Sequence, residues 1–373
     1  MPTTQDRAVA LLHGLEEGWD TLRRRLRGAP RGPLRIEPYL GHGDATRLRL
    51  RLRVLAGAPL PPPRPGAGLA ENLRRMARRF STDEVAHARV RAAAGGRRLD
   101  LAADEEGFAE IDLDGLDPLP GRGLRRRPVS LALPDWPGVE AVGHALVVPR
   151  EARLGVVSDV DDTILVTGAH SLWRNLYTSL TSDAEGRVAF PGVAAFYRAL
   201  QAGRAGAPTN PVFYVSSSPW NLHDLLVRFM ALHGIPEGPL FLRDLGLSAG
   251  GLTLKSGHAR HKLAAIEALF AFHPNLPFVL IGDGGQHDAA IYAETVRRHP
   301  RRVLAVYVRD IATTPAARRE TADLLVAVEG RGVPAVLCPD LTRAAEHAAK
   351  AGWIEPEAVA AVRGEAVREG RPS

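Results

Sequence analysis

Three aspartates lie within four residues of one another at the end of an apolar segment, GVVSDVDDTIL (residues 155–165). Carboxylates that lie so close together repel one another and raise one another's pKa, unless a cation offsets the repulsion. Asp159 and Asp161 are two residues apart, so they can direct a carboxylate and a backbone carbonyl toward one ion, or they can cap a turn. A calcium loop of the EF-hand type is excluded, because Ile164 and His170 stand where that loop needs glycine and glutamate.

A second candidate is Ser216, the first hydroxyl residue after the apolar run at 212–215, in the segment FYVSSSPWN (213–221). A hydroxyl between a strand and the N-terminus of a helix suits an anion such as a phosphate oxygen. Serine is also an ordinary helix N-cap, so this segment alone leaves both interpretations open.

Lys262 is the third candidate, because it stands at the beginning of a predicted helix, where its charge opposes the helix dipole. Only three of the 48 basic residues are lysines, so a lysine at this position indicates that a compact ammonium group is needed. Lys255 is the nearby competitor. We favour Lys262, since its helix leads to the next carboxylate-bearing strand.

Two further acids follow the apolar run at 278–281, in the segment GDGGQHD (282–288). Asp283 ends the predicted strand, and Asp288 opens the next helix. With Asp159 they would form a hard oxygen site of the kind that suits Mg²⁺, which keeps water and phosphate oxygens as its other ligands. A simple charge at a helix N-terminus is the alternative for Asp288.

From residue 153 apolar strands alternate with helices, and this alternation predicts where the candidate residues lie in the fold. The predicted strands are 154–157, 212–215, 278–281, 303–308 and 333–337, and the predicted helices are 193–201, 222–233, 262–272, 289–299 and 342–351. That alternation is typical of a parallel α/β sheet, whose ligands bind beyond the carboxyl ends of the strands. The four candidate segments lie at such ends or at helix starts.

The first 150 residues show a different pattern. Residues 5–27 have the periodicity of an amphipathic helix, and from about residue 33 polar and apolar residues alternate as in half-exposed strands. The predicted strands are 34–37, 46–54, 88–92, 97–101, 108–113, 129–133 and 141–148. Short strands separated by Gly, Pro and Asp turns predict a small β-sandwich. We find no cluster of catalytic residue types before residue 150.

Composition limits the classes of protein. With 45% hydrophobic and 24% charged residues we expect a soluble globular protein, since no apolar run is long enough to span a bilayer and no secretory signal pattern is present. A single cysteine, Cys338, predicts a reducing, cytoplasmic location. The net charge of +6 comes almost entirely from arginine with few interleaved aromatics, so no nucleic-acid partner is expected.

Together, and in this order, the four segments resemble the haloacid-dehalogenase superfamily of phosphotransferases, with its DxDxT motif, strand-end Ser or Thr, lysine and GDxxxxD acid pair. More narrowly, residues 153–310 look like the actin-patch-associated phosphatidate phosphatase catalytic-domain family. The segments that carry the resemblance are SDVDDTILVTG, FPGV, NPVFYVSSSPWNL, PLFLRDLG, HKLAAIEALF and PFVLIGDGGQHDAAIY. Family members usually have DSGQ at 283–286, where this chain has DGGQ, so Gly284 loses a hydroxyl near the metal while both acids are kept.

The resemblance implies a role for each residue. Asp159 would be the nucleophile that forms an aspartyl-phosphate, and Asp161 the acid that protonates the departing alkoxide and then activates water. Ser216 and Lys262 would hold the phosphoryl oxygens. The implied Mg²⁺ ligands are Asp159, Asp161 through its backbone carbonyl, Asp283 and Asp288, and the implied substrate-binding residues are Thr163, Ser217, Asn221 and Arg243.

The resemblance also implies an organisation and a function. We expect an N-terminal helix (1–30), a β-sandwich-like accessory domain (31–150), a Rossmann-like phosphatase domain (151–345) with a small cap at 167–190, and a C-terminal helical tail (346–373). The expected activity is Mg²⁺-dependent hydrolysis of phosphatidate to diacylglycerol and phosphate, with peripheral contact to a membrane. The alternatives are a phosphatase for a soluble sugar or nucleotide phosphate, and a lipid- or protein-binding scaffold with a vestigial phosphatase fold.

Overall fold

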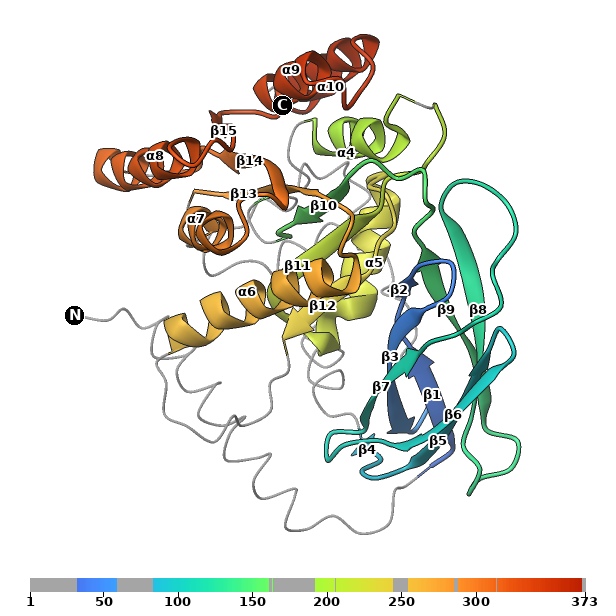
Figure 1. Cartoon of the computed structure of the whole chain (residues 1–373). Helices are drawn as coiled ribbons and strands as arrows, with labels where there is room; N and C mark the ends of the chain where they lie inside the picture. Colours follow the sequence, from blue (N-terminus) through green and yellow to red (C-terminus); the bar gives the residue numbers. More distant parts are fainter. Residues whose placement is uncertain are drawn as a thin grey trace, which may run out of the picture.

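The computed structural model of the chain describes residues 32–58, 83–160, 163, 192–204, 206–243, 254–284, 288–312 and 314–370. It contains one mostly antiparallel sheet and one parallel sheet, and the helices gather around the parallel sheet (Figure 1). The mixed α/β class predicted from the sequence is confirmed. The predicted N-terminal helix, the predicted cap at 167–190 and the predicted acid Asp161 lie outside the described residues.

The first sheet has nine strands in the order β1-β3-β2-β9-β8-β5-β6, and β4 and β7 also pair with β3. The strands are β1 (Leu34–Pro38), β2 (Gly41–Gly43), β3 (Leu48–Ala56), β4 (Asp83–Glu84), β5 (Arg89–Ala94), β6 (Arg97–Ala102), β7 (Phe108–Leu113), β8 (Arg125–Ala132) and β9 (Glu140–Val147). The seven predicted strands are therefore present, whereas β2 and β4 are too short to show a period. Hydrogen bonds link all nine strands into one sheet, so the predicted sandwich stays unconfirmed.

Strict alternation on β3 gives this sheet its core. Leu48, Leu50 and Leu52 are at most 1% exposed and pack with the apolar residues of the other strands. Successive side chains point to opposite faces of a strand, so the intervening arginines at 47, 49, 51 and 53 lie on the other face. That second face is turned toward the parallel sheet, as the contacts of its arginines with Phe272 and Trp220 show.

The second sheet has six parallel strands in the order β12-β11-β10-β13-β14-β15. They are β10 (Gly155–Ser158), β11 (Val212–Pro219), β12 (Leu240–Arg243), β13 (Phe278–Asp283), β14 (Val303–Arg309) and β15 (Ala335–Cys338). Numbered along the chain, this order is 3-2-1-4-5-6, which reverses between β10 and β13. Ligands of such sheets bind at the reversal, beyond the carboxyl ends of the strands. The five predicted strands are confirmed, and β12 was not predicted.

Helices cover both faces of the parallel sheet. They are α4 (Val193–Ala202), α5 (His223–Leu232), α6 (Leu254–Phe272), α7 (Asp288–Arg298), α8 (Pro315–Glu329), α9 (Thr342–Lys350) and α10 (Glu357–Gly370), with the 3₁₀ turn η1 (Trp220–Leu222) before α5. One apolar core joins the sheet to α4, α5, α9 and α10, and another joins it to α6, α7 and α8. Among these described helices, none is long and apolar enough to cross a membrane.

The two sheets contact each other through buried aromatic and histidine side chains. His42 of β2 lies 3.0 Å, Nδ1 to Nε2, from His273 just after α6, and both are at most 6% exposed. Tyr39 packs on Trp220, with 4.4 Å between ring centroids. Burial lowers the pKa of both histidines, that of His273 to about 4, so the pair is neutral at neutral pH. The nine-stranded sheet is thus docked on the half of the molecule that carries the candidate active site.

Candidate active site

Asp159 directly follows β10, at the point where the strand order reverses. Its backbone N–H donates to the carbonyl of Ile281 in β13, 2.9 Å away, and its side chain is 1% exposed. Ser158, the last residue of β10, pairs with Tyr214 of β11 and with Ile281 of β13. The register therefore places Asp159 beside the carboxyl end of β13, whereas β11 continues for four residues beyond Val215.

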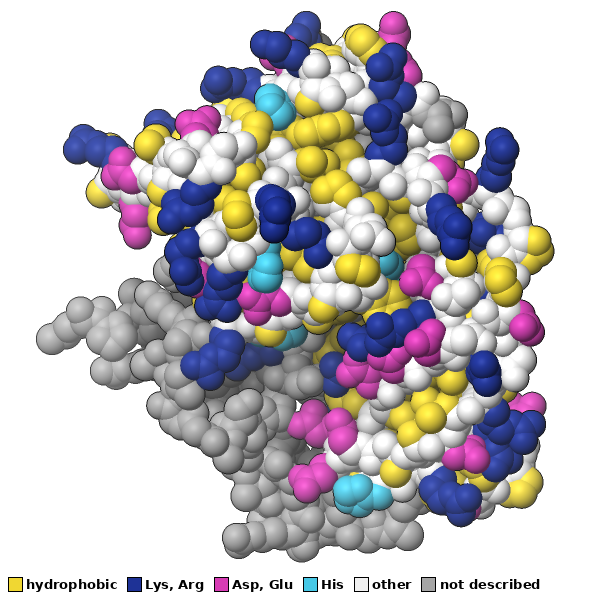
Figure 2. Space-filling view, viewed as in Figure 1, with side chains coloured by type: hydrophobic (Ala, Val, Ile, Leu, Met, Phe, Trp, Pro, Cys, Tyr) yellow, Lys and Arg dark blue, Asp and Glu magenta, His cyan; other side chains and the backbone are white. Residues whose placement is uncertain are grey.

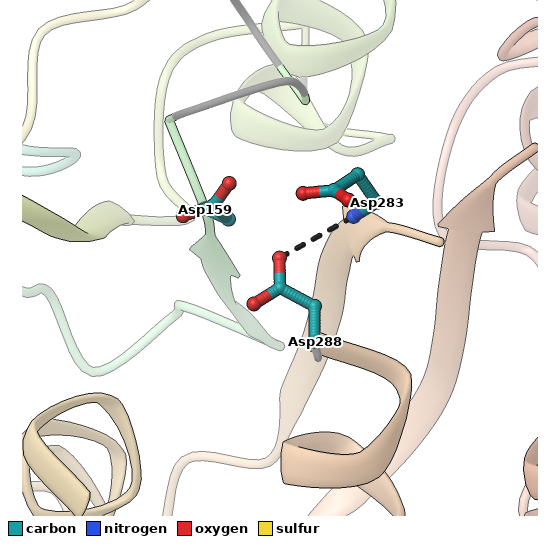
Figure 3. A group of neighbouring side chains, drawn as sticks. All are labelled: Asp159, Asp283 and Asp288. Atoms are coloured by element: carbon teal, nitrogen blue, oxygen red, sulfur yellow. Dashed lines mark hydrogen bonds between the residues drawn. The ribbon is translucent and has the colours of Figure 1, made fainter. Parts of the chain in front are cut away.

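Asp283 and Asp288 complete a cluster of three acids (Figure 3). One oxygen of each carboxylate lies within 4.8 Å of an oxygen of the other two, and all three side chains are buried. Asp159 comes from β10, Asp283 from the end of β13 and Asp288 from the first residue of α7. The backbone N–H of Asp283 donates to Oδ2 of Asp288, 3.3 Å away, so this acid stabilises the turn as well as facing the cluster.

Lys262 reaches into this cluster from the middle of α6 (Leu254–Phe272). The prediction that it begins a helix was wrong, because α6 starts eight residues earlier. Its Nζ lies 2.7 Å from Oδ1 of Asp159 and 2.6 Å from Oδ1 of Asp288. Burial alone would lower the pKa of Lys262, but the two carboxylates raise it above its usual value, so the ammonium stays charged. Three acids and one lysine leave two more negative than positive charges in this buried group. A divalent cation with oxygen ligands is the species that would balance them.

Gly282 allows Asp288 to approach β13. A Cβ at position 282 would lie 2.7 Å from Oδ2 of Asp288 and 2.8 Å from the hydroxyl of Tyr292, too close for either to stay in place. The same tyrosine hydroxyl donates to the carbonyl of Ile281, 2.8 Å away. A glycine within a strand often marks such a close approach, and this signal was present in the sequence although the prediction did not use it.

A buried chain of hydroxyl groups holds the backbone at Asp159. The hydroxyl of Ser158 donates to the carbonyl oxygen of Asp159, 2.5 Å away, and lies 2.6 Å from the hydroxyl of Tyr197 in α4. A serine hydroxyl has only one hydrogen, so Tyr197 must donate to Ser158. Burial raises the pKa of Tyr197, which keeps it a neutral donor. Neither residue was predicted to belong to the site.

Ser216 lies within the carboxyl half of β11, next to β10, and not after the strand as predicted, because β11 continues to Pro219. Ser216 is fully buried, and its hydroxyl accepts a hydrogen bond from the backbone N–H of Ser218, 2.9 Å away. This bond holds the side chain of Ser216 against the backbone of its own segment. Ser217 is half-buried, and Arg243, also half-buried, ends β12, where it pairs with Pro219.

The other two predicted substrate-binding residues have different surroundings. Thr163 is fully buried. Asn221 lies in η1 and accepts a hydrogen bond at Oδ1 from Arg53 of β3, 3.2 Å away, so one side of its amide is used by the nine-stranded sheet. The structure therefore brings Asp159, Asp283 and Lys262 together with Asp288, while the direct role of Asn221 toward a substrate stays a prediction.

The comparisons with known proteins concern this same half of the chain. Residues 154–310 match the model of the catalytic domain of phosphatidate phosphatase APP1. This segment contains all four predicted motifs and ends just after β14. Phosphatidate phosphatase APP1 of Saccharomyces cerevisiae is 31% identical over 160 residues, which are 42% of this chain and 26% of that protein.

An uncharacterized protein of Schizosaccharomyces pombe is 26% identical over 159 residues, which are 42% of this chain and 25% of that protein. The matched region thus covers about a quarter of the length of either curated relative. Among solved structures, a carbohydrate acetylesterase from Xanthomonas citri has a TM-score of 0.30 at 11% identity, covering 82% of this chain and 69% of that one. A similarity at that level supports no statement about fold or function.

Proposed function

We propose that this chain is a Mg²⁺-dependent phosphomonoester hydrolase of the haloacid-dehalogenase type that acts on phosphatidate through an aspartyl-phosphate on Asp159. The observation that carries the proposal is the buried cluster of Asp159, Asp283, Asp288 and Lys262 at the carboxyl edge of a parallel sheet. The match of residues 154–310 to a phosphatidate phosphatase catalytic domain supports the same chemistry.

The residues of the cluster fit a magnesium ion. Carboxylate oxygens are hard ligands, and the three acids outnumber the one lysine that contacts them. Asp159, Asp283 and Asp288 would hold the ion, with the backbone carbonyl of Asp161 as a further ligand predicted from the sequence. When bound, Mg²⁺ would offset the charge of the acids and of the phosphoryl group.

The chain's own groups would carry the reaction in two steps. A carboxylate oxygen of Asp159 attacks phosphorus, the bond to the alkoxide breaks, and Asp161 gives the alkoxide its proton. Asp161 then takes a proton from water, whose oxygen attacks the aspartyl-phosphate and releases phosphate and free Asp159. Lys262 and the hydroxyl of Ser216 would stabilise the charge on the phosphoryl oxygens, the main task in phosphoryl transfer.

Phosphatidate is proposed as the substrate because the yeast relative and the matched family model are both described as phosphatidate phosphatase. Within that proposal, Arg243 at the end of β12 is a cation that could pair with the anionic head group. A cytoplasmic protein that contacts the membrane peripherally would have access to such a lipid.

Phosphate release from phosphatidate in mixed micelles, compared with a panel of soluble phosphomonoesters, tests the proposal. We expect phosphatidate to be preferred, activity to disappear on chelation and to return with Mg²⁺, and Asp159→Asn to be inactive. Turnover of soluble esters alone would remove the lipid assignment and favour the soluble phosphatase. If the protein hydrolyses no ester with Mg²⁺ present, the enzyme assignment is wrong and a role as a binding scaffold is favoured.

A further inference from the structure

One face of β3 contacts η1, the turn that follows β11 and its serines. Arginines occupy every second position of β3, on the face opposite its own apolar core. The guanidinium groups of Arg47 and Arg49 lie 4.7 and 5.6 Å from the ring centre of Phe272, and that of Arg51 lies 4.9 Å from the ring of Trp220. The arginine face of the nine-stranded sheet is therefore an internal contact surface with the half of the molecule that carries the acids.

Arg53 makes the most specific of these contacts. It is 7% exposed, and its planar group donates in three directions. Nε donates to the carbonyl of Glu106 (3.0 Å), Nη2 to Oε1 of Glu84 (3.0 Å) and Nη1 to Oδ1 of Asn221 (3.2 Å). Glu84 of β4 and Glu106, in the turn between β6 and β7, fix the guanidinium group. The third bond therefore fixes the position of Asn221 as well.

This bond also decides which way the amide of Asn221 faces. Arginine has only donors, so the atom that meets it must be the amide oxygen, and the NH₂ group is then on the other side. Asn221 lies five residues after Ser216, in a turn that Trp220 anchors to Tyr39, with 4.4 Å between their ring centroids.

We propose that Arg53 is a positioning residue for the candidate active site. With Tyr39 and Arg51 it holds Trp220 and Asn221, which directly follow the strand that carries Ser216, and so fixes this side of the site relative to the acids. The nine-stranded sheet is then a part of the catalytic unit, although the matched family model begins only at residue 154. This inference rests on the proposed phosphatase function.

Arg53→Met tests it, with Arg127→Met as the matched control. Arg127 is an equally buried arginine of the same sheet, 4% exposed, and it donates to the carbonyls of Ala45 and Asp117, not to the parallel-sheet half. Both variants should lose stability. At a temperature at which both are folded, we expect kcat/KM for an aryl phosphate to fall about 10- to 100-fold in Arg53→Met and to stay within about twofold of wild type in Arg127→Met.

A double-mutant cycle shows whether Arg53 acts through its partner. In an Asn221→Ala background, Arg53→Met should cost no more than about a further twofold. Arg53→Lys keeps one charged donor and should recover part of the loss; if Arg53→Met does not fold, this variant carries the test. The inference would be overturned by a wild-type kcat/KM in both Arg53→Met and Arg53→Lys. It would also be overturned if Arg53→Met caused the same loss with and without the Asn221 side chain.

Amide hydrogen exchange separates this inference from the proposed function. We expect faster exchange in residues 216–223 for Arg53→Met than for Arg127→Met, and this result does not depend on any activity. If wild type hydrolyses no phosphate ester, the proposed function fails, and exchange still tests the support of the loop. Equal exchange in the two variants would contradict the positioning role.

Discussion

On the nine-stranded sheet, Arg47 and Arg49 form partly exposed pairs with Asp112, whereas at the edge of the parallel sheet three acids lie buried around Lys262. Arg47 and Arg49 reach Asp112 at 2.8 and 2.7 Å, and these side chains are 30–37% exposed. Figure 2 shows basic and acidic side chains intermingled over this side of the molecule. The acids of the candidate site are at most 1% exposed and close to one another.

On the proposed function, the contrast separates charges that maintain the fold from charges that carry the reaction. Exposed pairs are screened by water and contribute little, about 0 to 1 kcal/mol each. Buried like charges cost free energy unless a cation balances them, so they are found mainly at sites where the charge binds a ligand or takes part in a reaction. Substitutions in the two regions should therefore have different effects. At the buried acids we expect loss of activity without loss of stability, and at the exposed pairs a small loss of stability alone.

The largest effect is expected from Asp159→Asn. The change removes the proposed nucleophile and keeps the size of the side chain, so the rate of phosphate release should fall at least about 10³-fold. It also removes one of three repelling charges while Lys262 keeps Asp288 as a partner, so the melting temperature should not fall. Calorimetry and phosphate release on the same sample check both points, and an active or unfolded variant would contradict the comparison.

Gly282→Ala should have the next largest effect. The added methyl group would displace the carboxylate of Asp288 or the ring of Tyr292, and a shift of about 1 Å at a reacting group can cost about 100-fold in rate. Gly284→Ser is the control, because a Cβ there meets the carbonyl of Arg309 only at 3.1 Å, which a small shift relieves. That variant should keep most of the activity. Equal losses in both would show that crowding at Asp288 is unimportant.

Tyr197→Phe tests the hydroxyl chain behind the nucleophile. Losing a hydrogen bond of about 1 kcal/mol should lower kcat about fivefold, through the backbone of Asp159. Tyr214→Phe is the matched control, since Tyr214 is equally buried and its hydroxyl donates to the carbonyl of Pro236, 2.6 Å away. Both variants should lose similar stability, and kcat should change only in the first. If kcat falls equally in both, the chain has no special role.

The smallest effect is expected from Asp112→Asn, on the surface of the nine-stranded sheet. It should lower the free energy of unfolding by about 0.5–1 kcal/mol in low salt and by less in high salt, with activity unchanged. Hydrogen bonding to Arg47 lowers the pKa of Asp112, so this contribution is present above the carboxyl's ordinary pKa and is lost as the pH falls through the lowered value. Urea titrations at neutral and acid pH measure the difference between variant and wild type, and a cost that persists in acid would argue against the ion pair.

Sequence periodicity located seven strands of the first sheet and five of the second because their apolar residues recur at a fixed spacing. It also placed Asp159 and Asp283 at strand ends, where the structure brings them together with Lys262 and Asp288. Helix α8 was not predicted, since only three of its residues are buried, although Thr314 caps it and Pro315 begins it. Strand β12, with four residues, is too short for a period to be evident.

Contacts between distant segments could not be predicted in the same way. Tyr197 meets Ser158 across 39 residues of sequence, and Arg53 meets Asn221 across 168. The alternation on β3 predicted a half-exposed strand, but its arginine face is partly covered by the parallel-sheet half. Only tertiary packing decides whether such a face meets water or a neighbour.

Acid quenching during turnover of an aryl phosphate with Mg²⁺, followed by mass spectrometry of the peptides, tests the central claim most directly. The account predicts a phosphoryl adduct on Asp159 that accumulates in Asp161→Asn, where the hydrolysis of the intermediate lacks its base, and that is absent in Asp159→Asn. Turnover with no adduct in Asp161→Asn, or with the adduct on another residue, would contradict it.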